Sequence, residues 1–157
     1  MKYKLTNEKI QVNGKILFRI KALKNFGKVK KGDLGGYIEK ESNLSQKGEA
    51  WVYGNAKVYG NAHVYGNAWV YGNAEVYGNA EIVLGKIKQS PINITSLEWN
   101  ITITEKHIKI GCKIHTYTEW KKFNNKEIDK MDSEALDFWK RYKKHILGLA
   151  KLNRKGI

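Results

Sequence analysis

Besides its carboxylates, the sequence has five imidazole or thiol side chains, the kinds that most often ligate zinc or act as a nucleophile or base. They are the four histidines, His63, His107, His115 and His145, and the single cysteine, Cys112. A zinc site brings three or four such ligands together, whereas these lie in separate segments, so we expect no metal site. Cys112 falls on the apolar side of an alternating run, which favours core packing over nucleophilic catalysis. No carboxylate pair and no phosphate-binding glycine loop stand out, so we expect a protein that is not an enzyme and needs no cofactor.

A regular series of aromatic side chains could bind a ligand or a second subunit. Tyrosine follows an aliphatic residue every six positions, and because the aliphatic residue should point inward, the tyrosine should point outward. An exposed aromatic surface is typical of an interface or of a platform on which bases stack. We assign the subunit interface to Trp51, Tyr53, Tyr59, Tyr71 and Tyr77, and ligand contacts to His63, Tyr65 and Trp69.

Positive charge is concentrated in the two flanks of this aromatic region. The net charge of the chain is +14, with +8 in residues 1–47, −2 in residues 48–83 and +8 in residues 84–157. No acid follows Asp137, so the cations after it should face solvent or an anionic partner. The alternative is an ordinary solvated surface rich in lysine. We add to the ligand-binding set Arg141, Lys143, Lys144, and also His115 and Trp120, which could instead be packed side chains.

The element that must position the aromatic residues is an internal repeat of six residues. The repeat runs from Gly48 to Val83 as successive units of the form Val-Tyr-Gly-Asn-Ala-x. A helix would place a glycine in its interior every six residues, at about 1 kcal/mol each, so a short strand followed by a Gly-Asn corner fits better. Three units then make one coil of 18 residues. The coil predicts that equivalent positions stack, pairing Trp51 with Trp69, Lys57 with Glu75, and His63 with Glu81.

The flanks divide the rest of the chain. A hairpin is predicted at Asn13-Gly14, a second hairpin turning at residues 104–106, and a helix from about Ser133 to Lys151. The apolar stripe of that helix comprises Leu136, Trp139, Tyr142, Ile146 and Leu149. The expected domains are an N-terminal β cap (1–33), the hexapeptide repeat (34–86), a β-strand extension (87–115) and a basic helical tail (116–157).

The rhythm of aliphatic, glycine and small residues resembles the left-handed β-helix of hexapeptide-repeat proteins. The chain is similar, over nearly its whole length, to phage and prophage proteins with YGNA-type repeats. The similarity covers the segment Gly32-Asp33-Leu34-Gly35-Gly36-Tyr37-Ile38, the repeats, and the tail motif Ile110-Gly111-Cys112-x-x-His115-Thr116-x-x-Glu119-Trp120. The resemblance implies a mainly β fold with a short three-sided left-handed β-helix, an N-terminal β cap, a β-hairpin and a C-terminal α-helical extension. We expect a homotrimer.

Three functions remain open from the sequence. The first is a non-enzymatic, phage-type counter-defence protein that sequesters an anionic ligand, such as a nucleotide immune signal. The second is an inhibitor of a host defence system that binds nucleic acid or a nucleoprotein, in the manner of an anti-CRISPR protein, or binds a host defence protein. The third is an acyltransferase-like enzyme with His63 as base. The N-terminal residues lead into no apolar segment, so we expect a protein in the cytoplasm of a bacterial host, with no membrane partner.

Overall fold

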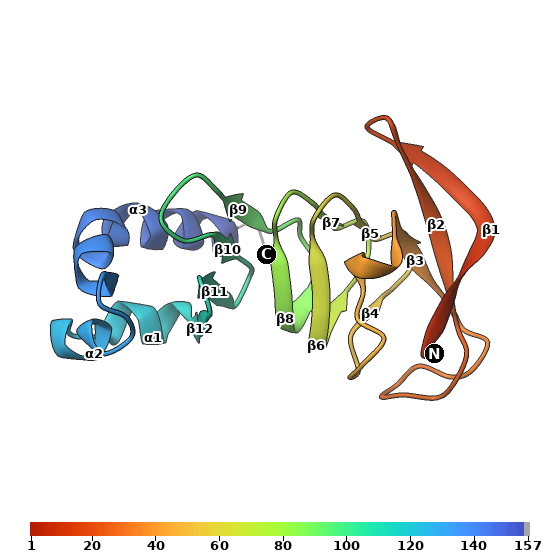
Figure 1. The fold of residues 1–157 in the computed structure, drawn as a ribbon, viewed down its shortest axis with the longest axis horizontal. Coiled ribbons are helices and arrows are strands. Elements are labelled where there is room, and N and C mark those ends of the chain that lie inside the picture. Colours follow the sequence, from red (N-terminus) through yellow and green to blue (C-terminus); the bar gives the residue numbers. More distant parts are fainter. Residues whose placement is uncertain (156–157) are drawn as a thin grey trace. The chain divides into compact units, whose positions relative to one another are not determined.

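The computed structural model describes residues 1–155 and shows a mainly β chain with helices towards its C-terminus. The chain divides into two compact units, Met1–Pro91 and Ile92–Ile157. The first unit contains the predicted cap and repeat, and the second contains the four-stranded sheet β9–β12 and the helices (Figure 1). Within the described residues, no helix is both long enough and apolar enough to span a membrane.

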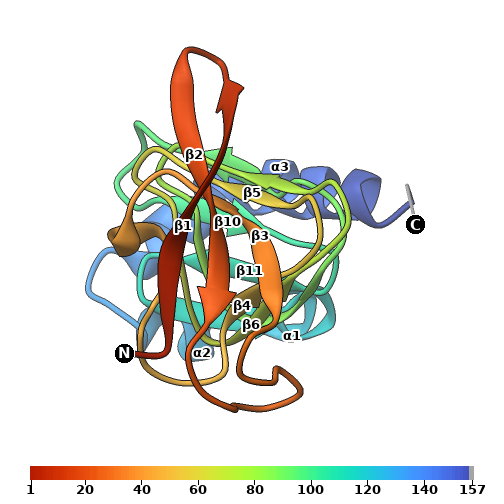
Figure 2. The same ribbon diagram turned by 90° about the vertical axis from the view of Figure 1, so that its right-hand side faces the viewer.

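The first unit begins with the predicted hairpin. Strands β1 (Tyr3–Val12) and β2 (Lys15–Ala22) pair antiparallel, and Asn13 and Gly14 between them both have positive φ, 49° and 78°. Two residues of this conformation match the twist of the flanking strands, so the predicted hairpin is confirmed. Strand β3 (Leu34–Ile38) pairs antiparallel with β2 and parallel with the next coil (Figure 2). The cap and the repeat therefore share one sheet.

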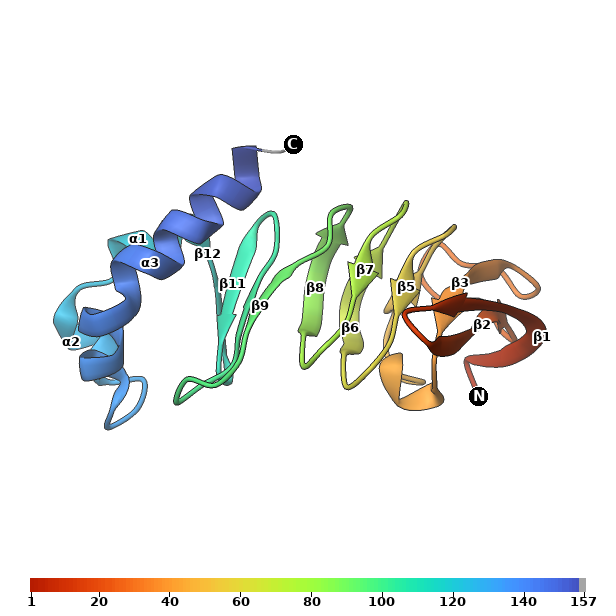
Figure 3. The ribbon, with the colours of Figure 1, turned by 90° about the horizontal axis from the view of Figure 1, so that it is seen from above.

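The repeat forms coils whose strands pair parallel, and equivalent residues lie 18 positions apart. Strands β3, β5 (Lys57–Val58) and β7 (Glu75–Val76) follow one another in one sheet, with Lys57 opposite Glu75. Strands β4 (Trp51–Val52), β6 (His63–Val70) and β8 (Glu81–Ile87) form another sheet. In it Trp51 lies opposite Trp69, and His63 opposite Glu81. Strands β6 and β8 run side by side (Figure 3). The predicted period of 18 residues is confirmed.

Each coil is stabilised by an apolar interior and by glycine at its corners. The repeat valines and alanines are buried in one core cluster, and burial of a valine side chain is worth about 1.5–3 kcal/mol. The corner glycines have φ between 58° and 68°, a region that L side chains rarely adopt. A short 3-10 turn (η1, Glu41–Asn43) adds a polar anchor, because the buried Asn43 amide donates to the carbonyl oxygens of Gly60 and Ala62.

The second unit contains an antiparallel sheet of four strands. The strands are β9 (Ile92–Ile94), β10 (Ile101–Ile103), β11 (His107–Ile110) and β12 (Lys113–Thr116), each paired with its neighbour in sequence. The predicted turn at residues 104–106 is confirmed by the β10–β11 pairing. The expectation that Cys112 packs in the core as part of an alternating run is wrong. Gly111, at φ 54°, and Cys112 form a tight turn in the middle of that run, so Cys112 is exposed and does not pack in the core.

Three helices follow the sheet: α1 (Tyr117–Lys122), α2 (Asn125–Asp129) and α3 (Ala135–Lys155). The long helix begins two residues later than predicted and continues four residues further. Of the predicted apolar stripe, Trp139 and Ile146 are buried, and Leu136, Tyr142 and Leu149 are partly buried against the same cluster. That cluster also contains the isoleucines of β10 and β11, so the apolar face of α3 packs on the sheet.

Close packing between coils gives a first prediction. A Cβ atom on Gly36 would lie 2.4 Å from the carbonyl oxygen of Ala56 and 2.6 Å from Cγ1 of Val52. We expect Gly36→Ala to lower the free energy of unfolding by about 1–3 kcal/mol, the usual cost of overpacking, as measured by urea denaturation. Gly148→Ala is the control. A Cβ atom there meets nothing within 4 Å, so this variant should gain about 0.5–1 kcal/mol. Unchanged stability of Gly36→Ala would contradict the packing.

A buried lysine in the cap gives a second prediction. Lys2 is 1% exposed, and its Nζ donates to the carbonyl oxygen of Ala50 at 2.8 Å. Burial, aided by the charge of Lys24, lowers the pKa of Lys2 to about 8. Between pH 8 and 10.5 the unfolded state therefore holds a proton that the folded state has lost, so folding becomes more favourable as pH rises.

The comparison of wild type with Lys2→Met isolates this effect. Over that pH range the wild-type free energy of unfolding should rise relative to the variant by less than about 3 kcal/mol, since one pKa unit corresponds to about 1.4 kcal/mol. Burial also raises the pKa of Tyr3, which weakens folding at high pH, but this contribution is common to both proteins. Parallel pH profiles for the two proteins would count against a neutral buried Lys2.

Candidate ligand-binding surfaces

The indole of Trp69 is the centre of an aromatic and cationic surface on the first unit. The side chain is partly exposed, and its Nε1 donates to the carbonyl oxygen of Glu49 at 3.1 Å. The Nζ of Lys28 lies 5.7 Å from the ring centroid, and that of Lys86 lies 5.8 Å away. Lys86 is positioned by β8, where it lies opposite Trp69 in the parallel register. Two ammonium groups thus lie against one partly exposed ring.

Two tyrosines extend this surface. Tyr53 and Tyr71 occupy equivalent positions in successive coils, and their rings stack with centroids 4.6 Å apart and an interplanar angle of 4°. Trp69 meets both of them edge-on. We call these five residues, Trp69, Tyr53, Tyr71, Lys28 and Lys86, the Trp69 surface.

The tyrosines of the Trp69 surface keep their protons at neutral pH. Burial raises the pKa of Tyr53 to about 12, helped by the nearby charges of Tyr71 and Asp33. Burial also raises the pKa of Tyr71. Neither phenol adds negative charge, so the surface presents flat neutral rings beside two cations. That combination suits a planar group joined to an anion.

The assignment of Trp51 to a subunit interface is wrong. Trp51 is 0% exposed, and its ring meets Tyr3 and Phe26 edge-on, at centroid distances of 6.1 and 5.3 Å. It belongs to the first full coil, which the N-terminal segment covers. Trp69 occupies the same position one coil later and escapes this cover. The sequence shows two equivalent residues, and only the placement of the cap distinguishes them.

Tyr59 is also unavailable for a subunit contact, for the same reason. It is 5% exposed and packs with Leu17 and Tyr37 of the cap. Its hydroxyl accepts a hydrogen bond from Asn13 and donates one to Glu75. Glu75 in turn accepts from Lys57 at 3.0 Å, which is the ion pair that the 18-residue period predicts. Tyr77 stacks on Tyr59, and it is 52% exposed.

His63 and Tyr65 lie earlier on β6, before the corner at Gly66. Their rings stack with centroids 4.8 Å apart. His63 lines an open groove whose other charged residues include Glu41 and Glu81. Lys40 also lines the groove, but the two carboxylates outnumber this cation, so the groove suits an anion less well than the Trp69 surface does. The three ligand contacts predicted on β6 therefore do not form one site: His63 and Tyr65 lie together, and Trp69 belongs to the Trp69 surface.

The tail motif is explained by packing. The Nε1 of Trp120 donates to the carbonyl oxygen of Ile108 at 2.8 Å, and the side chain is 3% exposed. Thr116 caps α1 by accepting from the backbone N–H of Glu119, whose carboxylate accepts in return from the backbone N–H of Thr116. The partly buried His115 packs edge-on against Trp120. Trp120 is thus mostly buried in the core, and its assignment to an anionic ligand stays a prediction.

The cations of α3 differ in their partners and in their exposure to solvent. Arg141 pairs with Glu98 at 3.2 Å, an acid far away in sequence, and Lys143 lies 5.6 Å from the ring centroid of Trp139. Lys144 is exposed. It shares one side of the helix with two other exposed lysines, and together they form the basic stripe Lys140, Lys144 and Lys151. This stripe is more open to an anion than Arg141 and Lys143.

A metal site is the other kind of binding site that four histidines and one cysteine could form. Across residues 1–155, no group of three or more His, Cys, Asp or Glu side chains is arranged to hold a metal ion. No family model matches the sequence, and no curated protein matches it. The function must therefore be argued from the two charged surfaces themselves.

Proposed function

We propose that the protein is a non-enzymatic binding protein for an anionic ligand that carries a planar base, and that the base stacks at the Trp69 surface. The observation that carries this proposal is the pair of lysine ammonium groups within 6 Å of one partly exposed indole. Stacking of a base on an aromatic side chain is worth about 1–3 kcal/mol. The ammonium groups of Lys28 and Lys86 supply the attraction for a phosphate.

The fold that we propose for the repeat is a three-sided left-handed β-helix. The parallel pairing at 18-residue intervals and the positive φ of the corner glycines support it. The resemblance to phage YGNA-repeat proteins leads us to propose a counter-defence role, in which the bound ligand is a nucleotide signal of host immunity. A homotrimer also remains a proposal, with the exposed Tyr77 and partly exposed Tyr53 and Tyr71 as its contact residues.

A second candidate function is binding of a nucleic acid polymer, favoured by the basic stripe of α3. Its three lysines lie at positions i, i+4 and i+11 of one helix. At a rise of about 1.5 Å per residue they extend for about 16 Å along one side, comparable to a few phosphates of a single strand. The acyltransferase hypothesis gains no comparable support, because His63 stacks on Tyr65 and lies opposite Glu81.

The test of the proposed function uses mononucleotides and a short oligothymidine as probes. We expect Trp69→Leu to weaken binding about tenfold, equivalent to about 1.4 kcal/mol, because a stacking face is lost. The double variant Lys28→Gln/Lys86→Gln should weaken binding further at low salt than at high salt. Fluorescence anisotropy of labelled probes measures both effects.

A control of equal charge is available in the same unit. Lys4 and Lys9 are exposed on β1, and their double change to Gln should leave the affinity within about twofold if the Trp69 surface is the site. Equal losses in the two double variants would show that only net charge matters. Full affinity of Trp69→Leu would remove base stacking there from the proposal.

The basic stripe is tested by its salt dependence. Changing Lys140, Lys144 and Lys151 together to Gln should reduce the slope of log affinity against log salt by about 2 for a single strand, since each phosphate contact contributes about 0.7. The control is Lys121, Lys122 and Lys126, exposed on or beside the short helices α1 and α2, changed to Gln together. A slope that changes equally in both triple variants would assign the effect to overall charge.

A further inference from the structure

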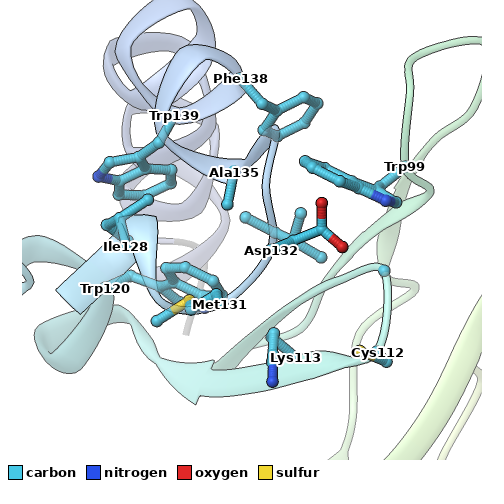
Figure 4. A pocket seen from close by; sticks show the side chains of 12 residues that line it. Trp99, Cys112, Lys113, Trp120, Ile128, Met131, Asp132, Ala135, Phe138 and Trp139 are labelled. Carbon is cyan, nitrogen blue, oxygen red and sulfur yellow. The ribbon is translucent and has the colours of Figure 1, made fainter. Parts of the chain in front are cut away.

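The second unit contains an aromatic cavity that the proposed function does not use. Its volume is about 60 Å³, and it lies between the β11–β12 turn and the helices (Figure 4). Four aromatic side chains line it: Trp99, Trp120, Phe138 and Trp139. Cys112, exposed in the turn, lies at the edge of the same cavity.

The aromatic side chains form two contacting pairs. Trp99 meets Phe138 at a centroid distance of 4.9 Å and an angle of 64°, and Trp120 meets Trp139 at 5.1 Å and 37°. Inclined rings present both faces and edges to the space between them. The face of an aromatic ring attracts cations, most strongly in tryptophan. Lys143 already lies over the ring of Trp139, which shows that this cluster tolerates a cation beside it.

The charged residues of the cavity also favour a cation. Asp132 is its one acidic lining residue, and Figure 4 shows its carboxylate directed towards Trp99. Asp132 accepts hydrogen bonds from the backbone N–H of Glu134 and the hydroxyl of Ser133, both at Oδ1. Lys113 lines the cavity as well, but its ammonium group is directed away from the aromatic rings in the same view.

The surrounding loop strengthens the local negative charge. Residues 129–137 hold four of the eight acids of residues 84–157, Asp129, Asp132, Glu134 and Asp137, against the single cation Lys130. The loop is thus an acidic segment within a strongly basic chain.

The size of the cavity limits the ligand. An engineered apolar cavity of about 150 Å³ accommodates benzene, so a cavity of about 60 Å³ encloses only about one or two methyl groups of a ligand, and the rest of the ligand stays in solvent. A nucleobase is too large to be enclosed. The ligand of this cavity therefore differs from the ligand of the Trp69 surface in both charge and size.

We propose that this cavity binds a small organic cation, a methylated ammonium group, by cation–π contact with the aromatic rings and charge pairing with Asp132. Cages of aromatic side chains recognise quaternary ammonium groups in this way. The group could belong to a free molecule such as choline or to a methylated lysine side chain of a partner protein. The chemistry is the same in both cases.

The experiment titrates the full-length protein with choline and with its neutral isostere 3,3-dimethylbutanol, and follows the indole N–H resonances by NMR. Choline should shift the resonance of Trp99, assigned with a Trp99→Phe variant, and should bind at least fivefold more tightly than the isostere. A peptide containing trimethyl-lysine and its unmethylated counterpart form the second arm. Tighter binding of the methylated peptide than of choline identifies a protein side chain as the source.

Two matched variants separate the role of Asp132 from general charge. Asp132→Asn should weaken choline binding at least fivefold, and the asparagine side-chain oxygen can accept the same hydrogen bond from the backbone N–H of Glu134, which preserves the turn. Asp129→Asn changes an exposed acid of the same loop that does not line the cavity and should have little effect. Equal binding of the isostere, equal effects of the two variants, or no binding of any cation would each overturn the proposal. None of these results bears on the Trp69 surface.

Discussion

The parallel register of 18 residues is the constraint on which the first unit depends. It places each residue of a coil over the equivalent residue of the next coil. The same residue type at one position of the repeat therefore forms a row along the unit. The valines form a continuous core, and the glycines at the corners have positive φ. The tyrosines of successive coils stack their rings in pairs. The variable position pairs Lys57 with Glu75 across one coil step. Parallel neighbours of opposite charge or like aromatic character stabilise such a stack.

The cap breaks the equivalence that the repeat creates. Strands β1 and β2 extend the sheet of β3, and the side chains of the N-terminal segment bury the aromatic residues of the nearest coil. Trp51 and Tyr59 become core residues, while Trp69 and Tyr77, one coil further on, remain accessible. The ligand site that we propose therefore lies in the part of the aromatic series that the cap leaves uncovered. The same cap places Lys28 near the ring of Trp69. It therefore buries two of the predicted contact residues, Trp51 and Tyr59, and adds a cation beside a third, Trp69.

In the second unit, the aromatic residues that pack in the core also line the small cavity. Trp120 is fixed by its hydrogen bond to Ile108 and belongs to the core, yet one of its sides borders the small cavity. The Gly111-Cys112 turn lines the same cavity. The two sites that we propose thus differ in the charge of their ligands: an anion at the Trp69 surface of the first unit and a small cation beside α3 in the second. The basic stripe of α3 lies on an exposed side of the helix, away from the apolar face that packs on the sheet.

The sequence by itself determined the elements whose pattern is periodic and local. Period six predicted the 18-residue coil, Asn13-Gly14 predicted the first hairpin, and the spacing of Trp139 and Ile146 predicted the buried side of α3, because each depends on neighbours within a turn or a coil. Tertiary structure alone decided which equivalent residues are accessible. Trp51 and Trp69 are identical in their repeat units, Arg141 finds Glu98 far away in sequence, and Cys112 is turned outward by the left-handed Gly111. Burial and long-range pairing depend on residues that are distant in sequence and close in the fold. A local sequence pattern carries no information about which distant residues these are.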